Sequence, residues 1–184
     1  MILSDIDIKK AINSGQIKIT PKPNLKKQLG TCSLDLRLSK DFKLFGYNHS
    51  AFIDVSDSKT FEHITESYTL KKSEPFVLHP GQFILGSTIE DVTLPNDIAA
   101  RLEGRSRLGR LGLIIHSTAG HIDPGWSGRI TLEITNIGKL PIILHEGNCI
   151  CHLVFEPLTG PVSKGYSKKK ENKWNKPGNL TAVK

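Results

Sequence analysis

The sequence lacks the features that would indicate a membrane or secreted protein. No run of apolar residues approaches the roughly 20 that a helix needs to cross a bilayer. The first residues, Met1-Ile2-Leu3-Ser4-Asp5, do not follow the pattern of a signal peptide. The three cysteines, Cys32, Cys149 and Cys151, cannot all pair within one chain, which favours a reducing compartment. We therefore expect a cytoplasmic protein with no membrane partner.

Positive charge is concentrated at the carboxyl end of the chain. Residues 161–184 contain seven lysines and one acid, which gives +6 of the total +7 and leaves +1 for residues 1–160. Because a near-neutral body is unlike a nucleic-acid-binding surface, we expect no nucleic-acid partner. The tail is either a solvated, flexible end or a mobile lid that closes over a polyphosphate. Gly160-Pro161 marks the predicted boundary between a body domain (1–160) and this basic tail (161–184).

The spacing of apolar residues predicts a mainly β fold with one short helix. Ser4 can cap a helix that runs from Asp5 to about Ser14. Further along, apolar and polar residues alternate, as in strands with one buried face. Many short strands separated by turns favour a distorted β-barrel or sandwich over a parallel α/β sheet. The predicted strands cover residues 31–38, 51–55, 76–78, 82–88, 129–135 and 140–155, the last broken at 146–148.

The segment 104–110, Gly-Arg-Ser-Arg-Leu-Gly-Arg, concentrates arginines in a short stretch. If it forms one helical turn, Ser106 and Arg110 share a face at i,i+4 spacing. Free backbone N–H groups and guanidinium groups would then suit phosphate oxygens. A solvated basic turn has the same pattern, so spacing alone leaves both interpretations open.

Asp123 and Trp126 stand at the two ends of a Pro-Gly turn. A carboxylate there can bind a sugar hydroxyl and an aromatic ring can pack on a sugar face. The alternative is an Asp-initiated turn with a tryptophan in the core.

Alternation in the predicted strand 129–135 sets Thr131, Glu133 and Thr135 opposite the apolar residues. A glutamate in the middle of such a strand usually faces solvent. If this face lines a pocket, partial desolvation would raise its pKa and make it a usable general acid and base.

The string Cys149-Ile150-Cys151-His152 resembles the spacing of metal ligands. In an alternating strand, however, Cys149 and Cys151 would face one way and His152 the other. We therefore expect no zinc site at this position. His116 is expected to be structural.

Motifs spread over nearly the whole chain resemble the dCTP deaminase family. The family shares its fold with the dUTPases, so the resemblance implies a distorted β-barrel assembled as a homotrimer with active sites between subunits. The signature of the zinc deaminases, H-x-E followed by P-C-x-x-C, is absent, so the implied deamination uses no zinc. The motifs are Ser4-Asp5-x-Asp7-Ile8, Ser33-x-Asp35-x-Arg37-Leu38, Gly104-Arg105-Ser106-x-Leu108-Gly109-Arg110-Leu111-Gly112-Leu113, His116-x-Thr118-Ala119, Ile122-Asp123-Pro124-Gly125-Trp126-Ser127-Gly128, Leu132-Glu133, Gly138-Lys139-Leu140-Pro141 and Phe155-Glu156-Pro157-Leu158-x-Gly160-Pro161.

The resemblance implies catalytic roles for four residues. Glu133 would carry a proton between the attacking water and the base. Ser106 and the backbone of Ala119 would hold that water. Arg110 would orient Glu133 and stabilise developing charge.

The resemblance also implies how the substrate is held. The phosphates, with Mg²⁺ bound to them, would contact Arg105 and Ser106, and Arg107 would add a contact or crowd the loop. Asp123 would bind the deoxyribose 3′-hydroxyl and Trp126 would crowd the 2′ position. The remaining implied contacts are Thr131, Leu132 and Glu133 on the pyrimidine and Tyr166 and Lys173 of the lid on the phosphates.

The activity expected first is deamination of dCTP to dUTP and ammonia, with dTTP as a feedback inhibitor. A bifunctional enzyme that continues to dUMP and diphosphate is the alternative, since His121 and the 117–120 string Ser-Thr-Ala-Gly are similar to such members. A plain dUTPase is a third alternative, and Glu133 argues against it because dUTPases do not need a carboxylate at this position. A non-enzymatic nucleotide sensor or a nucleic-acid binder also stays open. Arg107 and Pro177 depart from the family pattern.

Overall fold

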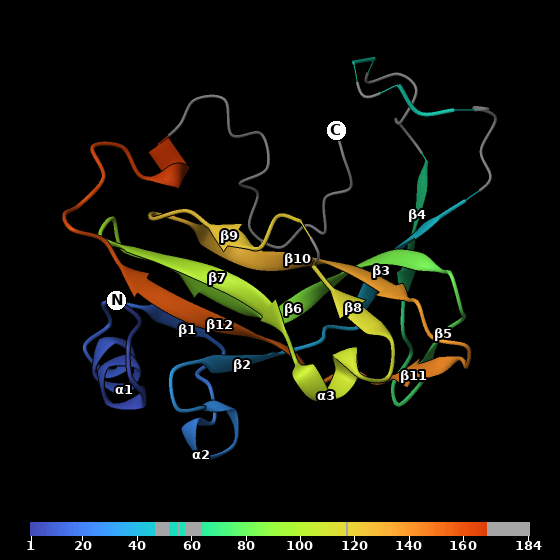
Figure 1. Ribbon diagram of the computed structural model, residues 1–184, viewed down its shortest axis with the longest axis horizontal. Helices are drawn as coiled ribbons and strands as arrows, with labels where there is room; N and C mark the ends of the chain where they lie inside the picture. Colours follow the sequence, from blue (N-terminus) through green and yellow to red (C-terminus); the bar gives the residue numbers. More distant parts are fainter. Residues whose placement is uncertain (47–51, 55, 58–63, 117, 169–184) are drawn as a thin grey trace.

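Antiparallel strands form the framework of the molecule, as the computed structural model shows for residues 1–46, 52–54, 56–57, 64–116 and 118–168 (Figure 1). The helices are short: α1 (Asp5–Asn13), α2 (Leu25–Gln28), α3 (Ser106–Gly109) and the 3₁₀ turn η2 (Tyr166–Lys168). The strands are β1 (Lys18–Thr20), β2 (Leu34–Arg37), β3 (Asp41–Phe45), β4 (Thr65–Thr69), β5 (Phe76–Leu78), β6 (Phe83–Thr93), β7 (Ile98–Gly104), β8 (Leu113–Ile115), β9 (His121–Ile122), β10 (Ser127–Asn136), β11 (Ile142–Leu144) and β12 (Cys149–Pro157).

Two larger sheets enclose the hydrophobic core. One has the strand order β4-β3-β6-β10-β8, with β1 also paired to β6, and the other has the order β2-β12-β7-β9. Strands β5 and β11 form a separate pair. Leu36 and Phe155 from one sheet and Ile84 and Leu132 from the other are fully buried in the same core. The predicted fold class, a distorted β-barrel or sandwich with a short amino-terminal helix, is therefore confirmed.

Several elements form where the sequence predicts them. The Ser4 side chain accepts a hydrogen bond from the Asp7 N–H (3.3 Å) and caps α1. This helix ends at Asn13, one residue before the predicted end. In β2, Leu34 and Leu36 are buried while Asp35 and Arg37 are only partly so, as the alternation predicts.

Other predictions differ from the structure. Strand β6 continues to Thr93, beyond the predicted end at Thr88. The prediction ends early because a glutamate stands at a buried position where the pattern requires an apolar residue. That residue, Glu90, accepts hydrogen bonds from Arg37 and Gln28. Strand β7 has no predicted counterpart, since three consecutive residues, 98–100, are buried and hide the alternation. Residues 52–54 lie outside any strand, and the rest of the predicted strand 51–55 lies outside the described residues.

Strand β7 links the two ends of the molecule that carry the candidate site residues. Its partner β12 pairs Pro157 with Ile98 at one end and Cys151 with Gly104 at the other. Six residue steps of an extended strand span roughly 20 Å. No helix within the described ranges is long and apolar enough to cross a membrane.

Candidate active site

A basic loop, residues 105–110, follows the carboxyl end of β7. Its backbone forms a single helical turn, the condition on which the sequence places Ser106 and Arg110 on one face, and the Arg110 N–H donates to the Ser106 carbonyl (3.1 Å). The side chains of Ser106, Arg107 and Arg110 are exposed. The loop therefore presents a hydroxyl and two guanidinium groups to whatever approaches this end of the molecule.

Arg105 is held differently from the other arginines of the basic loop. Its Nη1 donates to the carboxylate of Asp35 on β2. The side chain of Asp35 is 18% exposed and that of Arg105 is 36% exposed. In the sequence, Asp35 stands out only as part of a motif that resembles the family, and no role was predicted for it. Its polar position between the buried Leu34 and Leu36 was the available signal.

The sugar turn, residues 123–126, lies at the other end of β7. Its backbone is fixed by hydrogen bonds from the Gly125 N–H to the Pro95 carbonyl (3.1 Å) and from the Trp126 N–H to the Asp123 carbonyl (3.2 Å). The carboxylate of Asp123 is 3.5 Å from Nε2 of His121. Trp126 is half-buried and packs against the core, so both interpretations of this turn have a structural basis.

The tail root, residues 161–168, packs on the sugar turn. The Tyr166 N–H donates to the Pro124 carbonyl (2.8 Å), and the Tyr166 and Trp126 ring centroids are 5.1 Å apart. Burial, and secondarily the charge of Asp123, raises the pKa of the Tyr166 hydroxyl. The start of the basic tail is thus joined to the predicted sugar site, while Lys173 and Pro177 lie outside the described residues.

Glu133 lies in the middle of β10 on its polar side. Its side chain is half-buried, whereas Leu132 faces the core with no exposed surface, so Leu132 can offer only backbone groups. Thr131 is half-buried on the same side as Glu133. The Glu133 carbonyl accepts from the His116 N–H (2.9 Å), and His116 Nε2 donates to the Ala119 carbonyl (2.9 Å). His116 therefore ties the Ala119 backbone to the strand of Glu133.

The site residues form separate groups in one chain. Across the described part of the structure, neither Arg110 nor Glu133 forms an ion pair. The basic loop begins where β7 ends, and the sugar turn is bonded to the segment just before β7. Figure 1 shows α3 at the lower edge and the orange-red tail root at the upper left. The two groups are thus separated by roughly the 20 Å length of β7.

Comparison with known proteins identifies the family. A family model described as dCTP deaminase-like matches residues 2–158. The chain belongs to the dCTP deaminase-like family. The predicted family and the predicted hydrolase class are confirmed.

Relatives of this dCTP deaminase-like chain match most of its length. A protein of Methanosphaera stadtmanae named "dCTP deaminase, dUMP-forming" is 50% identical over 165 residues, 90% of this chain and 83% of the relative. A protein of the same name from Dictyoglomus thermophilum is 44% identical over 99% of this chain and 93% of its own length. A "dCTP deaminase" of Thermomicrobium roseum is 42% identical over 95% of this chain and 88% of its own.

The fold of the dCTP deaminase-like chain also matches a solved structure. The crystal structure of 2′-deoxycytidine 5′-triphosphate deaminase from Agrobacterium tumefaciens superimposes with a TM-score of 0.65 at 23% identity. The match covers 85% of this chain, which spans 47% of that one.

The cysteines of this dCTP deaminase-like chain depart from the predicted alternation. A register shift between Cys149 and Cys151 leaves Cys149 half-buried and places Ile150 and Cys151 together in the core. The prediction that both cysteines face one way is therefore wrong. Burial raises the pKa of both thiols. Over the residues that can be described, no three His, Cys, Asp or Glu side chains gather as a metal site.

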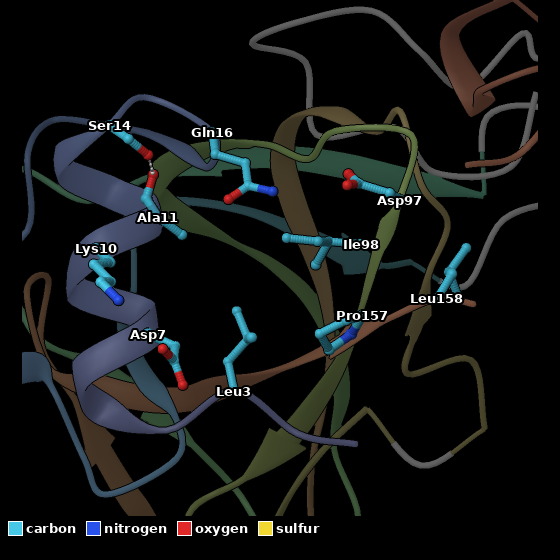
Figure 2. A pocket seen from close by; sticks show the side chains of 10 residues that line it. All are labelled: Leu3, Asp7, Lys10, Ala11, Ser14, Gln16, Asp97, Ile98, Pro157 and Leu158. Atoms are coloured by element: carbon cyan, nitrogen blue, oxygen red, sulfur yellow. Dashed lines mark hydrogen bonds between the residues drawn. The ribbon is translucent and has the colours of Figure 1, made fainter. Parts of the chain in front are cut away.

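A cavity of about 450 Å³ in the dCTP deaminase-like chain lies elsewhere, between α1 and the adjoining ends of β7 and β12 (Figure 2). Asp7, Lys10 and Asp97 are polar members of its lining, and Leu3 and Ile98 are apolar ones. None of the predicted site residues lines it. The cavity is therefore separate from the candidate active site.

Proposed function

We propose that this chain deaminates dCTP and then hydrolyses the nucleotide between the α- and β-phosphates. The products are ammonia, dUMP and diphosphate, and two waters are consumed. The observation that carries the proposal is the 50% and 44% identity to relatives named dUMP-forming, over 90% and 99% of this chain. Those relatives favour the bifunctional alternative over the dUTP-forming enzyme that the sequence led us to expect first.

Deamination is assigned to Glu133. Its carboxylate takes a proton from water and delivers it to N3 of cytosine, which makes C4 electrophilic. The hydroxide adds to C4, Glu133 transfers the proton of the new hydroxyl to the amino group, and the tetrahedral intermediate collapses to the C4 carbonyl as ammonia leaves. Half-burial on the polar side of β10 supports this role, because the carboxylate is held by the strand yet stays partly open. A positioned acid and base contributes about 10²–10⁴ in rate. Ser106 and the Ala119 backbone hold the water, and Arg110 stabilises the developing charge.

The second step is assigned to Asp123. Its carboxylate binds the 3′-hydroxyl and helps to activate a second water, which attacks the α-phosphate and displaces diphosphate. Nε2 of the neighbouring His121 lies 3.5 Å from this carboxylate, so His121 is assigned to fixing its orientation. Tyr166 and Trp126 pack together beside it and are assigned to the sugar and phosphates.

Magnesium enters as part of the substrate. Mg²⁺ characteristically keeps several waters and binds through substrate phosphates together with one or two carboxylates. Because the described residues form no cluster suited to a resident metal, the ion is assigned to the triphosphate. The arginines of the basic loop, including the partly exposed Arg105, then contact the remaining phosphate oxygens.

A complete site is proposed to need more than one copy of the chain. A deoxynucleoside triphosphate is shorter than the roughly 20 Å that separates the basic loop from the sugar turn. If the loop of one copy faces the turn of the next, both can contact one nucleotide. A closed homotrimer built on that contact has three such sites, since a head-to-tail interface closes into a ring.

A time course of the nucleotide products tests the proposal. The purified protein is incubated with dCTP and Mg²⁺, and ammonia, dUTP and dUMP are measured. We expect dUMP and ammonia to form in step, with dUTP staying low. Accumulation of dUTP would assign the chain to the dUTP-forming group, and dCTP left untouched while dUTP is hydrolysed would make it a dUTPase.

The same assay tests the role of Glu133. Glu133→Gln is expected to lower the rate of ammonia release by about 10²–10⁴ while dCTP binding stays measurable. Glu66→Gln, on the exposed face of β4, is the matched control and should retain the wild-type rate. Near-normal deamination by Glu133→Gln would remove Glu133 from this role.

A further inference from the structure

Asp35 is the partner of one arginine in the basic loop. It lies on β2, and its carboxylate accepts from Nη1 of Arg105 across the edge of the four-stranded sheet. The pairing register places Asp35 opposite His152 on β12, and His152 opposite Glu103 on β7. Arg105 follows Glu103 by two residues, so its side chain reaches back over this row to β2.

A buried hydrogen-bond network fixes the strand that carries Asp35. Glu90 has no exposed surface, and its carboxylate accepts from the Arg37 backbone N–H (2.9 Å) and from Arg37 Nε (2.6 Å). Gln28 Nε2 donates both to Glu90 (3.0 Å) and to the Asp35 carbonyl (2.9 Å). Because buried polar groups are costly to leave unpaired, this network holds the Asp35 backbone in one position.

We propose that Asp35 is a positioning residue, whose carboxylate holds the Arg105 guanidinium in place at the basic loop before the triphosphate arrives. The inference rests on the proposed function, which assigns Arg105 to the phosphates. A free arginine loses rotamer freedom when it binds an anion, and pairing with Asp35 removes that freedom beforehand. Arginine has five N–H donors, so the pair leaves donors for phosphate oxygens.

Two effects of Asp35 on an anionic ligand oppose each other. Its negative charge repels phosphate, whereas its hydrogen bond orients Arg105. The carboxylate is largely buried and its charge is offset by the guanidinium that it binds, so the orienting effect is the larger. Neutralising Asp35 should therefore weaken triphosphate binding, although simple charge repulsion predicts tighter binding.

The test compares Asp35→Asn with wild type in two measurements. These are the steady-state constants for dCTP with Mg²⁺ and the Kd of inorganic triphosphate. We expect KM for dCTP and the Kd of triphosphate to rise about tenfold, with kcat within about twofold of wild type. Glu103→Gln is the matched control, since it removes a negative charge near Arg105 without removing the pair, and it should leave both constants unchanged.

Two further variants separate positioning from folding. In an Arg105→Ala background, Asp35→Asn should add nothing to the loss of triphosphate binding, because its partner is already gone. Asp35→Glu keeps the carboxylate and should bind triphosphate within about threefold of wild type. Equal losses in both backgrounds, or triphosphate binding as tight as wild type in Asp35→Asn, would overturn the inference. A wild-type protein that binds triphosphate but leaves dCTP unchanged would overturn the proposed function and leave the Asp35–Arg105 pair to be judged by the Kd values.

Discussion

The two ends of β7 are held by different kinds of contact. The basic loop is held by side-chain contacts: Asp35 pairs with Arg105, and the buried Glu90 binds Arg37 of β2, the strand that carries Asp35. The sugar turn is held by backbone hydrogen bonds, since the N–H groups of Tyr166 and Gly125 donate to main-chain carbonyls. The basic-loop end should therefore respond mainly to changes of charge, and the sugar-turn end to added side-chain volume.

The largest expected effect comes from removing the buried carboxylate. Glu90→Ala leaves Gln28 and Arg37 without their shared acceptor, and Arg37 is partly open to water, so we expect the free energy of unfolding to fall by about 2–4 kcal/mol. Chemical denaturation measures this loss. Glu66→Ala on the exposed side of β4 should change the free energy by no more than about 0.5 kcal/mol. Equal losses in the two variants would mean that the Glu90 network does not support the basic-loop end.

A smaller effect is expected from adding one methyl group at the sugar-turn end. A Cβ on Gly165 would meet the Asn96 side-chain oxygen and, at 3.2 Å, Gly125 Cα. Gly165→Ala should loosen the tail root, speed amide exchange of Tyr166 and Ser167, and lower kcat/KM for dCTP about tenfold. Gly160→Ala, whose Cβ would meet nothing within 4 Å, is the control. Unchanged exchange at Tyr166 would show that the contact does not hold the segment.

The smallest expected effect uses Cys149 as a reporter of the basic-loop end. Burial, followed by the charge of Asp35, raises the pKa of its thiol, so the reactive thiolate is scarce near neutral pH and increases as pH rises. Iodoacetamide should label Cys149 more slowly than the exposed Cys32 at about pH 8, and dCTP with Mg²⁺ should slow Cys149 a further few-fold. Mass spectrometry follows labelling at both cysteines. Equal protection of Cys32 by dCTP would contradict the use of Cys149 as a reporter of nucleotide bound at the basic-loop end.

The fold was predictable where burial alternates and less so where it does not. The alternation of β2 and β10 is plain in the sequence, and Ser4 with Asp7 marks the start of α1. The continuation of β6 is hidden because Glu90 occupies a buried position that a distant strand and helix satisfy. Such long-range compensation leaves no local trace in the sequence.

The candidate site was predictable as a set of residues but not as an arrangement. The shared face of Ser106 and Arg110 could be considered from local spacing only on the condition of a helical turn, which the structure contains. The Asp35–Arg105 pair joins residues 70 positions apart, and the packing of Tyr166 on Trp126 joins residues 40 apart. Both depend on how the sheets bring distant segments together. Roles that come from the resemblance remain predictions until enzyme variants are measured.

Mixing two inactive variants tests most directly whether the two ends of β7 meet between copies of the chain. Ser106→Ala disables the basic loop and Asp123→Ala disables the sugar turn, and the two proteins are unfolded, mixed in equal amounts and refolded together. If one site takes its loop and turn from different copies, random assortment restores both in about a quarter of sites, and deamination of dCTP should return to about that fraction of wild type. A mixture no more active than the separate variants would contradict a shared site and require both ends to serve a nucleotide within one chain.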